Sequence, residues 1–165
     1  MSMETVTFHE IYSRYSRDVY RFAHWLSGSP AEADDIMAET FVRLWTSDSE
    51  IRFESVKAYL LAIARNIYLK GTRTDRRRAE LDDRLPDPHH SPLARVETRS
   101  ELGAVLRAMR QLSEIDRALL LLVAEEELSY DEIARATGLT VGAAKVRVFR
   151  ARMKLQSILQ DGVVQ

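Results

Sequence analysis

Residues 132–155 read EIARATGLTVGAAKVRVFRARMKL, and this stretch decides how the second half of the chain folds. It begins three residues after Ser129, and a serine followed by a glutamate at that spacing predicts a capping box at a helix start. Gly138 can adopt the left-handed conformation that closes a short helix, and Thr140 can cap the helix that follows. A short helix, a turn and a longer helix form a helix-turn-helix, whose second helix lies in the major groove of DNA. The stretch therefore predicts a DNA-reading element.

The longer helix has a concentration of positive charge, although the chain as a whole is close to neutral. The 165-residue chain has 24 Lys and Arg residues, 25 Asp and Glu residues and a net charge of -1. A basic helix alone is usually a solvated surface helix. Here the cap, the turn and the apolar positions Ala144 and Val148 fit a helix-turn-helix, which favours contact with phosphates and base edges. The cations available for such contacts are Lys145, Arg147, Arg150, Arg152 and Lys154.

Composition limits the class of protein. The 45% hydrophobic and 30% charged residues are typical of a globular domain. The chain has no cysteine, which excludes disulfides and thiolate metal sites and fits a reducing compartment. No segment approaches the roughly 20 apolar residues that span a bilayer, and residues 1–18 lack a signal-peptide pattern. We therefore expect a cytoplasmic protein without direct membrane insertion, and no motif indicates a bound cofactor or metal.

Apolar residues recur at helical spacing on both sides of a proline-rich segment, and no strand pattern occurs. Three of the four prolines lie in LDDRLPDPHHSP, which cannot continue a helix. We predict an all-α fold with two small helical domains, residues 1–80 and 97–165, joined by a flexible linker at 81–96. The expected helices span about residues 8–26, 30–45, 55–70, 95–112, 114–126, 129–136 and 141–159.

The segment AEADDIMAETFVRLW predicts an amphipathic helix with a charged face. The residues that share this face are Glu32, Asp35, Glu39 and Arg43. From the residues alone, a solvated face and a partner-docking surface are equally consistent with the pattern. A metal-carboxylate site built on Asp34, Asp35 and Glu39 is a third possibility, but no HExxH motif or second acidic motif supports it.

The third predicted helix combines aromatic and cationic residues, as a surface that captures unstacked bases requires. Asn66 lies late in a hydrophobic helix, where its amide gains little structurally but can both donate to and accept from a base edge. Tyr59 falls on the apolar stripe of the helix, and its spacing favours a core position over a stacking platform. The nearby cations are Arg65, Lys70 and Arg73.

These segments, in their order along the chain, resemble parts of bacterial sigma factors of the extracytoplasmic-function (ECF) class. LSYDEIARATGLTVGAAKVRVFRARMKL is similar to their promoter-reading C-terminal domain. AEADDIMAETFVRLW and FESVKAYLLAIARNIYLKGTR are similar to their polymerase-docking and −10-reading segments. The resemblance implies a non-enzymatic factor that binds core RNA polymerase, recognises −35 and −10 promoter elements and directs transcription initiation. Its implied partners are the clamp helices of the largest polymerase subunit, the flap of the second-largest, promoter DNA and an anti-sigma factor.

The resemblance also implies roles for residues of the first domain. Asp35, Glu39 and Arg43 would contact the clamp helices. Asn66 and the loop at 46–53 would form a pocket for a flipped −10 base, and the cations on the DNA backbone would be Arg65, Lys70 and Arg73. Two positions depart from the family. Ala38 replaces a frequent glutamine, and Ala62 replaces a frequent cation.

In the second domain, the resemblance implies a division of the recognition helix. Val146 and Phe149 cannot form hydrogen bonds, so we expect them to sense thymine methyl groups or groove shape. The residues that would face bases are Lys145, Val146, Phe149 and Arg150, and those nearer phosphates are Thr140, Arg147 and Arg152.

Two other functions are consistent with the residues. A stand-alone transcriptional regulator would use the same helix-turn-helix, typically as a dimer, without polymerase. A metal-dependent nuclease would use Asp34, Asp35 and Glu39.

Overall fold

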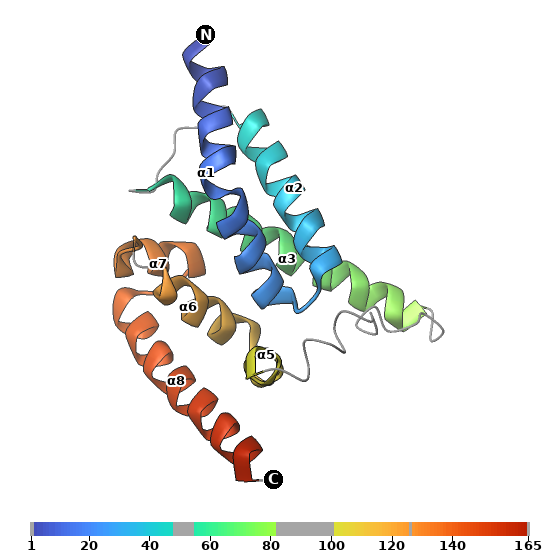
Figure 1. Ribbon diagram of the computed structural model, residues 1–165, viewed down its shortest axis with the longest axis vertical. Coiled ribbons are helices and arrows are strands. Elements are labelled where there is room, and N and C mark those ends of the chain that lie inside the picture. Colours follow the sequence, from blue (N-terminus) through green and yellow to red (C-terminus); the bar gives the residue numbers. More distant parts are fainter. Residues whose placement is uncertain (1, 48–54, 82–100, 126, 165) are drawn as a thin grey trace. The chain divides into compact units, whose positions relative to one another are not determined.

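Every secondary-structure element in the described part of the chain is an α-helix, which confirms the predicted all-α fold (Figure 1). The chain divides into two compact units, Met1–Leu85 and Pro86–Gln165. Residues 82–96 of the predicted linker lie outside the described residues. The computed structural model describes residues 2–47, 55–81, 101–125 and 127–164, and the side chains of residues 8–47, 55–72, 101–125 and 127–162.

The first unit is built from three packed helices in its described part. They are α1 (Ser2–Ser27), α2 (Pro30–Thr46) and α3 (Val56–Leu81). α1 and α2 lie side by side, and α3 packs against both (Figure 1). Burial of apolar surface between them is the main stabilising term of such a small core. The largest fully buried apolar side chains are Val19, Leu26, Leu60 and Leu61.

The turn between α1 and α2 is built from local capping contacts. Gly28 takes a φ of 74°, which only glycine adopts at low cost, and its N–H donates to the His24 carbonyl at 2.7 Å. Ser29 is the N-cap of α2, since its hydroxyl oxygen accepts from the Glu32 N–H at 3.2 Å, and Pro30 opens the helix. This turn fixes where the charged face of α2 begins.

The buried face of α3 differs from the predicted stripe. Leu60 and Ile67 are buried, but Tyr59, which the spacing places on the apolar stripe, is only half-buried, as is Ile63. The Tyr59 hydroxyl instead lies 3.3 Å from the Ser47 hydroxyl, within hydrogen-bonding distance. α3 contacts two helices rather than one, so its buried surface is broader than a single stripe. The additional buried side chains are Ala58, Leu61, Ala62, Ala64 and Tyr68.

Two helices extend beyond their predicted ends. α3 continues through Gly71 to Leu81, because one glycine in a helix interior costs only about 1 kcal/mol and does not end it. α8 (Val141–Val164) also continues past residue 159. The structure describes the first helix of the second unit, α5, from Glu101, and residues 95–100 of its predicted span lie outside the described residues.

The second unit places α8 against the other helices of the unit. These are α5 (Glu101–Arg110), α6 (Glu114–Ala124) and α7 (Tyr130–Thr137). Ser113 caps α6 by accepting from the Asp116 N–H at 3.3 Å. Arg117 is buried, and its guanidinium donates at 2.6 Å to the carbonyl of Leu112, which lies in the connection between α5 and α6.

The helix-turn-helix forms through the contacts that the sequence predicts. The Glu132 N–H donates to the Ser129 hydroxyl at 3.2 Å, and the Ser129 N–H donates to the Glu132 carboxylate at 3.1 Å, which completes the capping box. Gly138 ends α7 with a φ of 74°. The Thr140 hydroxyl oxygen accepts from the Ala143 N–H at 3.1 Å and so caps α8. The predicted helix-turn-helix is therefore confirmed.

Candidate functional site

α8 is anchored on one face and exposes an apolar ridge on the other. Ala144, Val148 and Ala151 are at most 1% exposed, and they hold the helix against the unit. Opposite them, Val146 is 50%, Phe149 66% and Met153 56% exposed. These three residues lie at i, i+3 and i+7, so they form one line along the helix. We call them the apolar ridge. A line of large exposed apolar side chains indicates a contact surface.

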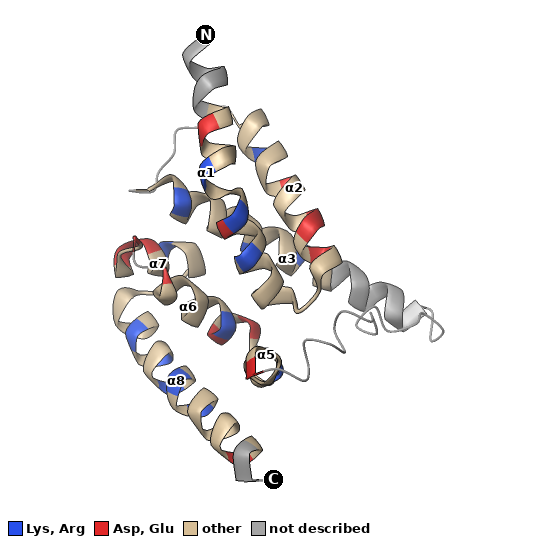
Figure 2. Ribbon diagram, in the orientation of Figure 1, with Lys and Arg blue, Asp and Glu red and all other residues tan. Residues whose placement is uncertain are grey.

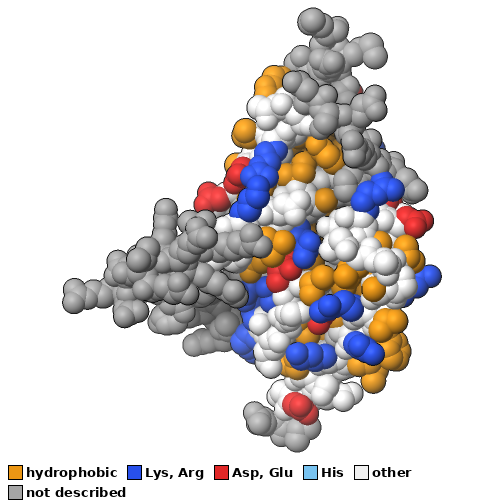
Figure 3. Space-filling model, turned by 180° about the vertical axis from the view of Figure 1, so that it is seen from behind, with side chains coloured by type: hydrophobic (Ala, Val, Ile, Leu, Met, Phe, Trp, Pro, Cys, Tyr) orange, Lys and Arg blue, Asp and Glu red, His pale blue; other side chains and the backbone are white. Residues whose placement is uncertain are grey.

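Cations flank the apolar ridge on both sides. Helical geometry places Lys145 and Arg152 along one side, and Arg147, Arg150 and Lys154 along the other. All five are exposed. Figure 2 shows the cations distributed along α8, and on the lower right of Figure 3 hydrophobic and cationic side chains lie side by side. An apolar centre between two cationic margins can meet base edges while the margins reach the phosphates on either wall of a groove.

Two of these cations are held by other helices of the unit. The Lys145 ammonium lies 5.3 Å from the centroid of the Tyr130 ring, a cation–π contact. The Arg147 Nε donates to the Asp116 carboxylate at 3.3 Å. Thr140 is exposed at the start of α8, where its hydroxyl accepts an N–H bond and can still donate its own proton. The DNA contacts of these residues stay predictions.

In α3 the predicted −10 residues fall on two sides of the helix. Asn66 and Lys70 are exposed one turn apart and lie on one line. Arg65 is half-buried and lies about 100° around the helix from Asn66. Arg73 belongs to α3, but its side chain lies outside the described residues, as do residues 48–53 of the predicted base pocket. The structure therefore brings Asn66 and Lys70 together and separates Arg65 from them.

The predicted docking residues of α2 lie on one exposed strip. The Arg43 guanidinium donates to the Glu39 carboxylate at 3.0 Å, and Asp35 lies one turn before Glu39. Exposed i, i+4 pairs of this kind contribute only about 0.3–0.5 kcal/mol, so the pair orders the strip more than it stabilises the helix. Within the described residues, no group of three carboxylate or histidine side chains could hold a metal ion. Asp34, Asp35 and Glu39 therefore do not assemble a metal site there.

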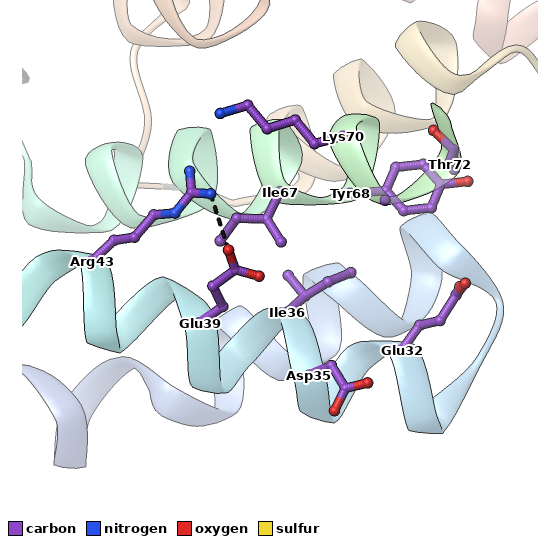
Figure 4. Close-up of a pocket in the computed structure, with 10 residues that line it drawn as sticks. Glu32, Asp35, Ile36, Glu39, Arg43, Ile67, Tyr68, Lys70 and Thr72 are labelled. Atoms are coloured by element: carbon purple, nitrogen blue, oxygen red, sulfur yellow. Dashed lines mark hydrogen bonds and ion pairs between the residues drawn. The ribbon is translucent and has the colours of Figure 1, made fainter. Parts of the chain in front are cut away.

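A hollow of about 320 Å³ lies between α2 and α3 (Figure 4). The predicted docking residues and one predicted −10 residue meet at this hollow, because Lys70 of α3 lines it together with Asp35, Glu39 and Arg43 of α2. Three carboxylates and two cations line the hollow, which gives it mixed charge. The residues that line it are Glu32, Asp35, Ile36, Glu39 and Arg43 from α2, and Ile67, Tyr68, Lys70, Gly71 and Thr72 from α3.

Beside the α2 strip lies an apolar groove that sequence reasoning missed. Trp45 is 57% and Val42 60% exposed, and the Trp45 ring packs against Phe8 with centroids 4.6 Å apart. The signal in the sequence is the i, i+4, i+7 spacing of Ala38, Val42 and Trp45, which lies next to Asp35 and Glu39 on the wheel. We call this hollow, which has a volume of about 540 Å³, the apolar groove. It is lined by Phe8, His9, Tyr12, Met37, Ala38, Phe41, Val42 and Trp45.

A membrane-spanning helix is not found among the described residues, where each helix is too short or too polar to cross a bilayer.

Comparison with known proteins relates both units to one family. Residues 11–78 match the family model of Sigma-70 region 2, and residues 102–155 match that of Sigma-70, region 4. The chain is 29% identical over 163 residues to the ECF RNA polymerase sigma factor SigM of Bacillus subtilis (strain 168), which covers 96% of this chain and 98% of that protein. It is 33% identical over 143 residues to the ECF RNA polymerase sigma factor EcfG of Rhodopseudomonas palustris (strain TIE-1), covering 84% of this chain and 77% of that protein.

A solved structure also resembles the fold. It is the sigma factor RpoE from Bartonella quintana, crystallised in complex with the anti-sigma factor NepR. The match has a TM-score of 0.78 at 26% identity and covers 93% of this chain and 97% of the RpoE chain.

Proposed function

Because the chain belongs to the sigma-70 family, in its ECF class, we propose that it binds core RNA polymerase and directs transcription initiation at promoters with −35 and −10 elements. The observation that carries this proposal is the pairing of the two units. One matches sigma region 2 and presents a charged and apolar face on α2, and the other matches sigma region 4 and presents a helix-turn-helix. In this role the chain acts in the cytoplasm, and the polymerase rather than the chain performs the chemistry.

Docking on polymerase uses the α2 strip together with the apolar groove. Asp35, Glu39 and Arg43 contact the clamp helices and set the register of the complex by charge, as charged rims of interfaces do. The groove supplies the apolar area that gives affinity, with Trp45 as its exposed aromatic anchor. The groove also compensates for Ala38, since an apolar contact can replace the polar one that glutamine provides in relatives.

Promoter opening uses the exposed line of α3. Asn66 pairs with the edge of an unstacked −10 base, and Lys70 neutralises the adjoining backbone. Because Lys70 also lines the hollow with Glu39, polymerase docking and −10 binding occur on adjoining surfaces of the first unit.

Recognition of the −35 element uses α8. The apolar ridge meets thymine methyl groups or the shape of the groove, while Lys145 and Arg150 reach base edges beside it. Thr140, Arg147 and Arg152 bind phosphates and fix the register of the helix.

We also infer regulation by an anti-sigma factor. The RpoE structure of similar fold contains one, NepR. In this chain the apolar groove is an exposed surface that such an inhibitor would cover, which would prevent polymerase docking.

The test is transcription by purified core polymerase on a pool of genomic DNA, with and without this protein. New start sites that share −35 and −10 sequences are the expected result. Absence of new start sites contradicts the proposal. Tight operator binding by a dimer without polymerase would instead support the stand-alone regulator, and DNA cleavage that requires a divalent metal would support the nuclease.

A further inference from the structure

One acid lies beside the cationic helix. Asp116, in the first turn of α6, is paired with Arg147 of α8 across 31 residues of sequence. Their atoms Oδ1 and Nε are 3.3 Å apart, and the side chains are 20% and 44% exposed. Within the described residues, Arg150, Arg152 and Lys154 of the same helix have no such partner. An acid so close to a DNA-binding face would ordinarily repel phosphate, so its position requires a reason.

We propose that Asp116 is a positioning residue, which holds the Arg147 guanidinium in the orientation that binds a −35 phosphate. This inference rests on the proposed −35 function of α8. It assigns to α6, which does not itself face DNA in the proposal, a part in promoter affinity.

The atoms of the contact support this role. A guanidinium has five N–H donors in a planar fork, and Asp116 accepts from the Nε. The four N–H groups on the two terminal nitrogens remain available, and a planar fork of this kind binds phosphate oxygens through two parallel hydrogen bonds. An acid that bound the terminal nitrogens would compete with phosphate, whereas an acid at Nε leaves them available.

The surroundings of Asp116 reduce its repulsion of DNA. Its own N–H donates to the Ser113 cap, so the carboxylate lies in the first turn of α6. Partial positive charge at a helix N-terminus stabilises an acid in this position. The carboxylate is also the less exposed partner, because the Asp116 side chain is 20% exposed and the Arg147 side chain 44%. The pair therefore presents mainly its cation to a ligand.

The benefit is a smaller loss of side-chain freedom on binding. A free arginine loses many rotamers when it docks on phosphate, while one already held loses fewer. Ordering a long side chain at an interface costs an amount that corresponds to about a two- to tenfold change in affinity. We therefore expect Asp116→Ala to weaken promoter binding by about two- to tenfold, even though the substitution removes a negative charge.

The experiment measures promoter affinity of the reconstituted holoenzyme by fluorescence anisotropy, on a promoter obtained from the genomic transcription test. The variants are Asp116→Ala, Asp116→Asn, Arg147→Ala and the double variant Asp116→Ala with Arg147→Ala. Asp161→Ala is the matched control, since it removes an exposed acid from α8 and changes the net charge equally. Thermal unfolding of each variant reports any loss of fold.

The expected pattern has three parts. Asp116→Ala weakens binding, Asp116→Asn retains most of the affinity because its amide oxygen still accepts from Nε, and Asp116→Ala has no further effect once Arg147 is alanine. Arg147→Ala should also lower the slope of log affinity against log salt by about 0.9, the value for one phosphate contact. In the Asp161→Ala control, affinity stays at the wild-type value.

Three results would overturn the inference. They are equal or tighter binding by Asp116→Ala, tighter binding by Asp116→Asn, and additive losses in the double variant. Failure of the proposed function gives a different result, since the wild-type holoenzyme would then show no promoter preference at all.

Discussion

Val148 and Phe149 are neighbours in sequence, about 100° apart around α8, and one is buried while the other is exposed. Substituting each by alanine should therefore separate DNA binding from stability. Phe149 is 66% exposed, whereas Val148 is 1% exposed. A phenylalanine carries roughly 200 Å² of surface, so DNA can cover at most roughly 130 Å² of it. At roughly 25 cal/mol per Å² this is an upper bound of roughly 3 kcal/mol. We expect Phe149→Ala to weaken promoter binding by about 1–3 kcal/mol, roughly 5- to 150-fold.

Val148→Ala should show the reverse pattern. Removal of two buried methyl groups costs about 1.6 kcal/mol in transfer free energy, and the cavity left behind adds to this. The midpoint of thermal unfolding should therefore fall for Val148→Ala and change little for Phe149→Ala. Promoter affinity of the Val148→Ala holoenzyme, measured well below that midpoint, should stay close to wild type.

The assays are fluorescence anisotropy of holoenzyme on a cognate promoter and circular dichroism melting of the free protein. A promoter with deoxyuridine in place of thymidine in the −35 element tests what Phe149 senses. Loss of the methyl groups should weaken wild-type binding and leave Phe149→Ala unaffected if the ring contacts them. A Phe149→Ala protein that binds as tightly as wild type, or that unfolds as early as Val148→Ala, would refute the assignment of this face to DNA.

Other substitutions test the remaining surfaces. Arg150→Ala should cost about 1–3 kcal/mol on the correct −35 sequence only, and an equal loss on random DNA would contradict base reading. Trp45→Ala should weaken binding to core polymerase by about 10- to 100-fold, because it removes an aromatic anchor. Thr46 is the exposed neighbouring residue, and Thr46→Ala is the control that should leave this binding unchanged. Ser129→Ala should lower the free energy of unfolding by about 1 kcal/mol through loss of the capping box, and an unchanged melting curve would contradict that role.

The helix-turn-helix was predictable in residue detail because its signals are local. Ser129, Glu132 and Gly138 act within one helical turn of their partners, so the contacts at 3.1 and 3.2 Å follow from sequence spacing alone. The three segments that resemble the family, in their order along the chain, were likewise sufficient to identify the sigma family, which the family matches confirm.

The surfaces between helices were not predictable in this way. A single apolar stripe assumes one neighbouring helix, but α3 contacts two, so its buried surface also includes Ala58 and Tyr68. Tyr59 is only half-buried, which the stripe did not predict. The apolar groove depends on how α1 meets α2, and nothing local distinguishes an exposed Trp45 from a core tryptophan. The Asp116–Arg147 pair joins residues 31 positions apart, and only the packing of α6 on α8 brings them together.

The near-neutral total of 24 cations and 25 acids conceals two surfaces with different physical demands. Affinity for a protein partner comes mainly from buried apolar area, so acids beside the apolar groove can specify register without supplying the binding energy. Affinity for DNA comes largely from cations that release counterions from phosphates, so an acid near α8 directly opposes it. In the proposed −35 role, Asp116 is tolerable there only if it improves the action of a cation more than it weakens the positive field. A contact with the Nε of Arg147, which leaves the terminal nitrogens for phosphate, would meet this condition.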